Sequence, residues 1–170
     1  MPIVKKLRVG NKLIEGGRVY KVFKITFLEN EGRKERIIHY KPHYQDSNYG
    51  SLVCSIPECN LVDTDKRMPV SKREILDILK YLSKRSNRKN EVDAVDAKSV
   101  LSLNDFHETA KVLKGFWREK IKKDVNFTKT KSDVLQRAID NMVEEVALVF
   151  GISTDNAKQK INLALKNYPN

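Results

Sequence analysis

Residues 67–82 read RMPVSKREILDILKYL, and the hydrophobic pattern of this 170-residue chain changes within them. Ser71 and Glu74 have the spacing of a capping box, in which a hydroxyl and a glutamate three residues later bind the first free amides of a helix. Apolar residues then recur at helical spacing, namely Ile75, Ile78, Leu79 and Leu82. We therefore predict a helix that begins after Ser71 and buries one apolar stripe.

On the N-terminal side of this stretch the pattern is that of short β-strands. Most of the glycines lie there, between four β-rich runs: residues 12–14, 18–27, 36–44 and 51–56. One face of the third run carries Ile38, Tyr40 and Tyr44, and the other carries His39, Lys41 and His43. Pro42 has no amide hydrogen, so this strand ends there or lies at an edge. Short strands separated by turn signals predict a small, strongly bent sheet or barrel.

On the C-terminal side the helical period continues to the end of the chain. A short helix is weakly signalled over residues 93–101, and Asn104 can cap a longer one. The apolar side of that longer helix carries Phe106, Ala110, Leu113, Trp117 and Ile121. Ser132 opens the most strongly patterned helix, which ends at Gly151, and Ser153 opens the last one.

The predicted fold class is therefore α+β in two domains. A small bent β-sheet or barrel occupies residues 1–68, and a compact all-α bundle occupies residues 69–170. Residues 1–68 carry 13 basic and 8 acidic side chains, and residues 69–170 carry 20 and 14. The excess of positive charge is therefore shared by the two parts and is not confined to a basic tail.

Composition excludes several classes of protein. The net charge is +11, which favours a polyanion or an acidic protein surface as partner. No run approaches the roughly 18 apolar residues of a membrane span, and no apolar leader opens the chain, so we expect no membrane contact. Cys54 and Cys59 are too few for a disulfide scaffold and indicate reduced thiols in a cytoplasmic protein.

Neither a metal site nor a catalytic centre is predicted. His39 and His43 would lie about 13 Å apart in a strand at roughly 3.3 Å per residue, and the spacing of Cys54 and Cys59 matches no compact zinc knuckle. No nucleophile elbow, phosphate-binding loop or His-Glu-x-x-His motif is present. We therefore expect a protein that is not an enzyme and that holds no metal or cofactor.

The single tryptophan, Trp117, falls on the apolar side of its helix, so we predict a core position for it. Basic residues flank it on the same helix: Lys111, Lys114, Arg118, Lys122 and Lys123. These side chains either contact phosphate or form an ordinary solvated face.

Several segments resemble one known family. They are residues 7–11 (LRVGN), 55–60 (SIPECN), 67–74 (RMPVSKRE) and 110–118 (AKVLKGFWR), followed by the helix from Ser132. In this order and spacing they are similar to the CarD/CdnL-like bacterial transcription factors, whose N-terminal module also occurs in transcription-repair coupling factors. The resemblance implies a Tudor-like module that docks on the RNA polymerase β subunit. It also implies a helical domain that contacts promoter DNA and modulates the stability of the open complex.

We therefore expect two sets of contact residues in a monomeric regulator. Polymerase contacts are expected at Arg18, Lys41, Tyr49 and Ser55. DNA contacts are expected at Arg85, Arg88, Lys89, Lys111, Lys114, Arg118 and Lys122. Arg88 and Lys89 stand where the family carries an exposed tryptophan, so the contact with DNA would be electrostatic. Two alternatives remain, namely an adaptor whose basic bundle binds an acidic protein, and a nucleic-acid binder that never meets the polymerase.

Overall fold

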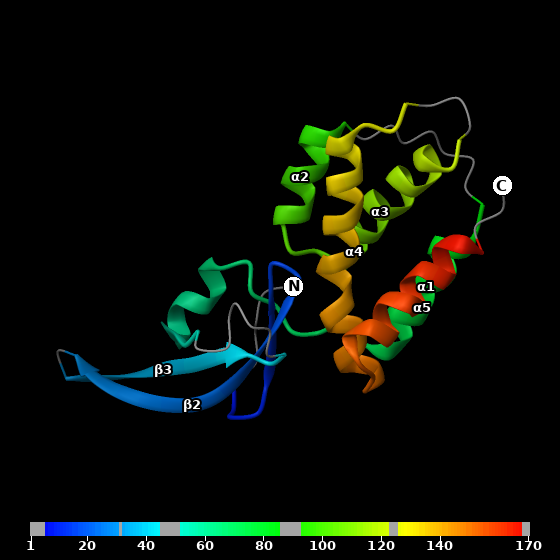
Figure 1. Cartoon of the computed structure of the whole chain (residues 1–170). Helices are drawn as coiled ribbons and strands as arrows, with labels where there is room; N and C mark the ends of the chain where they lie inside the picture. Colours follow the sequence, from blue (N-terminus) through cyan, green and yellow to red (C-terminus); the bar gives the residue numbers. More distant parts are fainter. Residues whose placement is uncertain (1–5, 31, 45–51, 86–92, 123–125, 168–170) are drawn as a thin grey trace. The chain divides into compact units, whose positions relative to one another are not determined.

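The computed structural model describes residues 6–30, 32–44, 52–85, 93–122 and 126–167 (Figure 1). It has mixed α+β structure, with a four-stranded antiparallel sheet followed by helices. The chain divides into two compact units, Met1–Pro69 and Val70–Asn170. They are called the sheet unit and the helical unit below, and each is described by itself.

Where the sheet unit is described, it forms four strands in the order β1-β2-β3-β4, each antiparallel to its neighbour. The strands are β1 (Lys12–Glu15), β2 (Arg18–Asn30), β3 (Arg33–Pro42) and β4 (Cys54–Pro57). Gly16 and Gly17, with φ of 56° and 79°, form the two-residue turn between β1 and β2. Such turns need positive φ at both positions, which glycine adopts without steric cost. All four predicted strands are present, although the last one begins three residues later than expected.

The third strand ends at Pro42, as its missing amide hydrogen predicted. Tyr44 therefore lies beyond the strand and is half-buried, whereas we expected it to share the buried face of Ile38 and Tyr40. Its ring packs edge-on against His43, with 4.8 Å between centroids. The alternation of faces cannot extend past the residue at which the strand stops.

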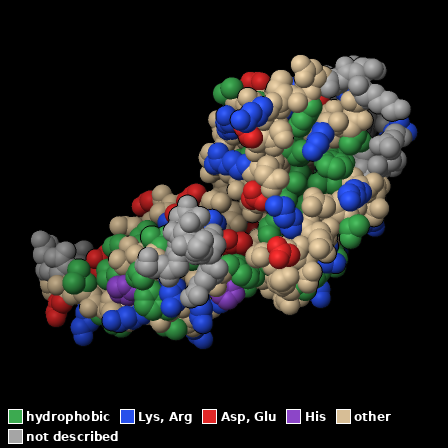
Figure 2. Space-filling model, viewed as in Figure 1, with side chains coloured by type: hydrophobic (Ala, Val, Ile, Leu, Met, Phe, Trp, Pro, Cys, Tyr) green, Lys and Arg blue, Asp and Glu red, His purple; other side chains and the backbone are tan. Residues whose placement is uncertain are grey.

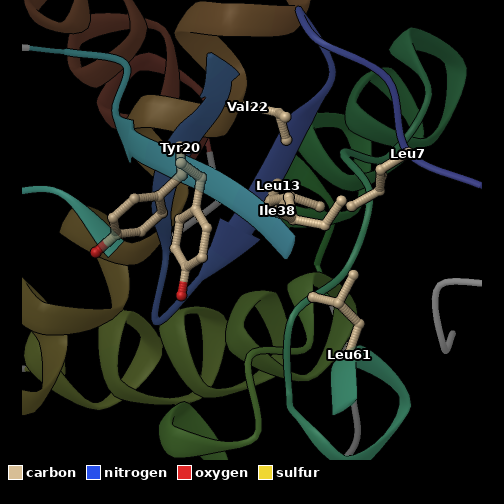
Figure 3. Close-up of a cluster of buried hydrophobic side chains, with 7 residues drawn as sticks. Leu7, Leu13, Tyr20, Val22, Ile38 and Leu61 are labelled. Atoms are coloured by element: carbon tan, nitrogen blue, oxygen red, sulfur yellow. The ribbon is translucent and has the colours of Figure 1, made fainter. Parts of the chain in front are cut away.

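One face of the sheet carries the core of the sheet unit (Figure 3). Its buried members come from all parts of the unit: Leu7, Leu13, Tyr20, Val22, Ile38, Tyr40 and Leu61. The rings of Tyr20 and Tyr40 meet edge to face, with centroids 5.5 Å apart. Leu61 belongs to the 3₁₀ helix η1 (Glu58–Asp63), which follows β4 and packs against β3.

An ion pair fixes the N-terminal segment to this core. Arg36 donates to both carboxylate oxygens of Glu58, at 2.7 and 2.5 Å, and to the carbonyl of Leu7 at 2.8 Å. The amide of Leu7 donates to the same carboxylate at 3.1 Å. Three segments distant in sequence are thereby held together, which explains how Leu7 is only 1% exposed without belonging to a strand.

The described residues of the helical unit form five helices, and α4 contacts each of the others. They are α1 (Lys72–Ser83), α2 (Ala94–Ser102), α3 (Phe106–Lys120), α4 (Lys129–Phe150) and α5 (Thr154–Lys166). The predicted capping box at Ser71 and Glu74 is confirmed, as is the helix start at Ser153. Gly151 ends α4 in the left-handed conformation, with φ of 65°.

Two predicted helix starts are wrong. Asn104 does not cap α3, because it is buried with φ of 54°; the cap is Asp105, which accepts from the amides of His107 and Glu108. The helix that we expected to open at Ser132 begins one turn earlier, with Thr128 as its N-cap. In both places a second capping residue lies within four residues of the expected one, and the local pattern does not distinguish the two.

Candidate functional site

The sheet unit holds the residues predicted to contact RNA polymerase. Lys41, near the end of β3, and Ser55, in β4, are exposed and lie on the face opposite the core, as the strand alternation places them. Arg18 opens β2 opposite Glu15, is half-buried, and lies on the core side of the sheet. Tyr49 lies outside the described residues. The four candidates therefore do not form one cluster in the described part of the chain.

Strands β2 and β3 extend beyond their neighbours as a two-stranded arm. The β1 pairing ends at Lys21, and two backbone bonds between Val22 and the segment before β1 follow it. From Lys24 to Asn30, β2 has no further strand beside it among the described residues, apart from β3. The arm carries two exposed apolar side chains, Phe27 (66%) and Leu28 (53%). An unpaired edge with apolar side chains is a template for pairing with another chain.

The face opposite the core, called the outer face below, carries a row of lysines. Lys12 lies opposite Lys21 across β1 and β2, and Lys21 lies opposite Lys41 across β2 and β3. Lys21 and Lys41 are exposed, and Lys12 is half-buried. Figure 2 shows Lys, Arg and His side chains gathered over this unit. The sequence had predicted only one part of this arrangement, the placement of His39, Lys41 and His43 on one face of the third strand.

An aromatic side chain lies beside the lysine row. Phe23 occupies the irregularity in the register between Val22 and Lys24, a β-bulge that re-aims its side chain. The Lys41 ammonium is 5.3 Å from the centre of the Phe23 ring, and the His39 ring is 6.3 Å from it. His39 in turn shares a hydrogen bond with the hydroxyl of Thr26, at 2.8 Å. The outer face thus combines cations with a half-buried ring.

In the helical unit the predicted DNA contact at Lys114 is wrong. The residue is 3% exposed, and its ammonium donates to the carbonyl of Tyr81 at 2.6 Å. The same ammonium lies 3.9 Å from the centre of the Tyr81 ring. Burial lowers the pKa of Lys114, and the nearby charges of Arg118 and Lys84 lower it further. Lys114 therefore joins α3 to α1 and cannot reach phosphate.

The structure also changes the placement of Trp117 on α3. We expected it in the core, but its neighbour Phe116 is the one that is buried, at 1% exposed. Trp117 is half-buried, and the ammonium of Lys120 lies 5.8 Å from its ring. The buried side of α3 is broad, because α1, α2 and α4 all pack on it. Burial extends to positions that a single apolar stripe would leave in water.

The other basic residues predicted to contact DNA differ in their exposure and in their partners within the fold. Lys111 is exposed and paired with Glu108 at 2.5 Å, an ion pair whose hydrogen bond raises the pKa of the lysine. Arg118 is half-buried and has partners within the structure. Arg85 and Lys122 are exposed and follow the last turns of α1 and α3. Arg88 and Lys89 lie outside the described residues.

Arg85 and Lys122 lie at the same end of the helical unit. Helices α1 and α3 run in the same direction, because Glu74 near the start of α1 pairs with His107 at 3.7 Å, whereas Tyr81 near its end accepts from Lys114. The C-terminal ends of both helices are therefore neighbours. Cations at such ends also complement the helix dipole, so their position alone does not define a binding site.

The thiols and imidazoles do not assemble into a reactive or metal-binding group. Cys54 and Cys59 are free, and the described residues contain no cluster of three His, Cys, Asp or Glu side chains suited to a metal ion. The thiol of Cys59 donates to Glu35 at 2.9 Å, and this bond raises the pKa of the thiol. Among the described helices, none has the length and hydropathy needed to cross a membrane.

Comparison with known proteins adds no relative to this picture, since neither the family models nor the curated proteins searched contain a match to this chain.

Proposed function

We propose that this chain is a CarD-like transcription regulator without catalytic activity. The sheet unit would dock on the β subunit of RNA polymerase, and the helical unit would contact promoter DNA and so modulate the stability of the open complex. The resemblance of four ordered segments to that family supports the proposal. The observation that carries it is the arm of β2 and β3, whose unpaired edge can accept a strand from a partner.

The arm suits strand addition for two reasons. Main-chain hydrogen bonds along residues 24–30 would provide affinity, and alternate side chains would provide specificity. Phe27 and Leu28 point to opposite faces, so an added strand would cover one apolar side chain on each face. Lys41 belongs to the outer face rather than to this edge, so strand addition does not involve its side chain.

The docking part of the proposal can be tested with the full chain and purified core RNA polymerase. Phe27→Lys places a charge on the arm, a substitution that natural edge strands use against pairing. We expect it to weaken binding at least about tenfold, which is roughly 1.4 kcal/mol. Val95→Lys, at an equally exposed position of α2, is the matched control and should bind normally. Absence of binding by the unsubstituted chain at about 100 μM would contradict polymerase docking.

The DNA part is tested by the salt dependence of binding to a promoter duplex. Arg85 and Lys122 are the exposed candidates at the shared end of α1 and α3. Replacing both with Gln should reduce the salt slope by about 1.8, because each lost phosphate contact removes roughly 0.9. An unchanged slope would mean that these cations only complement the helix dipoles, and that duplex DNA binds elsewhere or not at all.

A further inference from the structure

The lysine row on the outer face places like charges directly opposite one another across the sheet. Side chains directly opposite each other in an antiparallel pair have Cβ atoms about 4.5–5.5 Å apart, and like charges there destabilise the sheet. None of Lys12, Lys21 and Lys41 forms an ion pair with any carboxylate of the described residues. A bound polyanion would relieve this repulsion.

The groups on this face also perturb one another. Burial lowers the pKa of Lys12, and the positive charge of Lys21 lowers it further. Burial likewise lowers the pKa of His43, and the charges of Lys12 and Lys21 add to the effect. Both shifts disfavour the protonated form, as burial and nearby positive charges do.

The Phe23 ring indicates which kind of polyanion fits the lysine row. Sites for single-stranded nucleic acid combine cations that follow the phosphates with aromatic rings on which bases stack. A duplex keeps its base faces inside its own stack and would leave Phe23 without a role. An acidic protein would satisfy the lysines but offers no stacked base for the ring. The combination of Phe23 with the exposed Lys21 and Lys41 on one face of the sheet therefore favours a single strand.

We propose that the outer face binds single-stranded nucleic acid, with Lys12, Lys21 and Lys41 contacting phosphates and Phe23 stacking on a base. The Lys41 side chain now lies beside the Phe23 ring and would turn toward a phosphate when a base occupies that position. This site uses the face of the sheet, whereas the proposed polymerase contact uses the edge of β2. It goes beyond the proposed function and requires no polymerase.

The test uses the full chain and a fluorescein-labelled oligothymidylate of roughly 12 nucleotides, followed by fluorescence anisotropy at several salt concentrations. Lys21→Gln with Lys41→Gln should weaken binding and reduce the salt slope by about 1.4, at roughly 0.7 per phosphate contact on a single strand. Phe23→Leu should weaken binding about 5- to 100-fold with an unchanged slope, because stacking does not involve counterions. Lys34→Gln with Lys98→Gln removes the same charge from exposed positions outside the row and is the matched control.

Three outcomes would overturn the proposal. The unsubstituted chain could show no anisotropy change at about 100 μM. The control variant, Lys34→Gln with Lys98→Gln, could lose as much affinity as Lys21→Gln with Lys41→Gln. Binding would then depend on the total positive charge of the chain and not on the lysine row. A duplex of equal length could bind as tightly as the single strand. Folding is checked by thermal melts. The melting temperature of the variant with Lys21→Gln and Lys41→Gln should equal or exceed that of the unsubstituted chain, because a repulsion between like charges has been removed. Polymerase docking is measured separately, so either proposal can fail alone.

Discussion

Lys111 and Lys114 lie three residues apart on α3 and have opposite environments. Lys111 is exposed, and its ammonium pairs with Glu108 on the same helix. Lys114 is buried, and its ammonium donates to the backbone of Tyr81 on α1. A surface ion pair contributes little to stability, whereas a buried ammonium that lost its acceptor would retain the full cost of leaving water. The two lysines therefore have different roles, although both were expected to contact DNA.

We predict that Lys114→Met lowers the free energy of unfolding by about 1.5–3 kcal/mol, the usual net contribution of a hydrogen bond to a charged group. Lys111→Met should change it by no more than about 0.5 kcal/mol. Urea denaturation followed by circular dichroism measures both. Equal losses in the two variants would show that Lys114 is no more important to the packing of α1 on α3 than its exposed neighbour is.

At the scale of the element, the start of α1 is a closed hydrogen-bonded unit. The Ser71 hydroxyl accepts from the amide of Glu74 at 3.2 Å, and the Glu74 carboxylate accepts from the amide of Ser71 at 2.8 Å. The hydrogen bonds from Ser71 lower the pKa of Glu74, and His107 adds to this shift. The carboxylate is therefore harder to protonate in the folded chain than in the unfolded one.

The pH dependence of stability follows from this shift. Because the folded pKa lies below the ordinary value of 4.5, the unfolded chain binds the proton first as the pH falls. The stabilisation by Glu74 is thus complete above pH 4.5 and is lost as the pH falls through the folded pKa. We predict that Glu74→Gln keeps most of the stability at pH 7, since glutamine also completes a capping box, and loses less of it on acidification.

Urea unfolding at neutral and acidic pH measures this difference. Ser71→Ala serves as the companion variant, and we expect it to cost about 1 kcal/mol at pH 7 through loss of the N-cap. A Glu74→Gln variant with the same acid dependence as the unsubstituted chain would show that other carboxylates account for the loss.

At the scale of the whole molecule, each unit has a core of its own. The sheet unit buries the cluster around Ile38, and the helical unit buries the residues of α4 that face the other helices. Val70 opens the helical unit, where its amide donates to the buried carboxylate of Glu145 at 2.8 Å. A division of the chain that keeps Val70 with α4 therefore leaves this hydrogen bond intact.

We predict that a fragment of residues 70–170 folds alone and melts cooperatively with a helical circular-dichroism spectrum. A fragment of residues 1–69 should be less stable, because small units bury a smaller fraction of their surface on folding. Far-UV circular dichroism during heating tests both expectations. A gradual, non-cooperative melt of the longer fragment would mean that the helical unit depends on the sheet unit for its stability.

Signals that act within about four residues were readable from the amino-acid sequence. The capping box at Ser71 and Glu74, the left-handed Gly151 and the turn at Gly16 and Gly17 depend only on close neighbours along the chain. For the same reason the order of strands followed by helices could be predicted. Where two neighbouring residues could both cap, as at Asn104 and Asp105, the local signal did not distinguish them.

Tertiary structure alone decided the candidate sites. The lysine row exists because strand pairing places Lys12 opposite Lys21 and Lys21 opposite Lys41, residues 9 and 20 positions apart. The two-residue turn sets the first of these pairings, whereas the second depends on the bulge between Val22 and Lys24, which no turn signal specifies. Lys114 is buried because α1 lies alongside α3 and offers it a carbonyl. Composition alone had shown only an excess of positive charge, while packing and register determined which cations are buried, which are paired and which remain available to a partner.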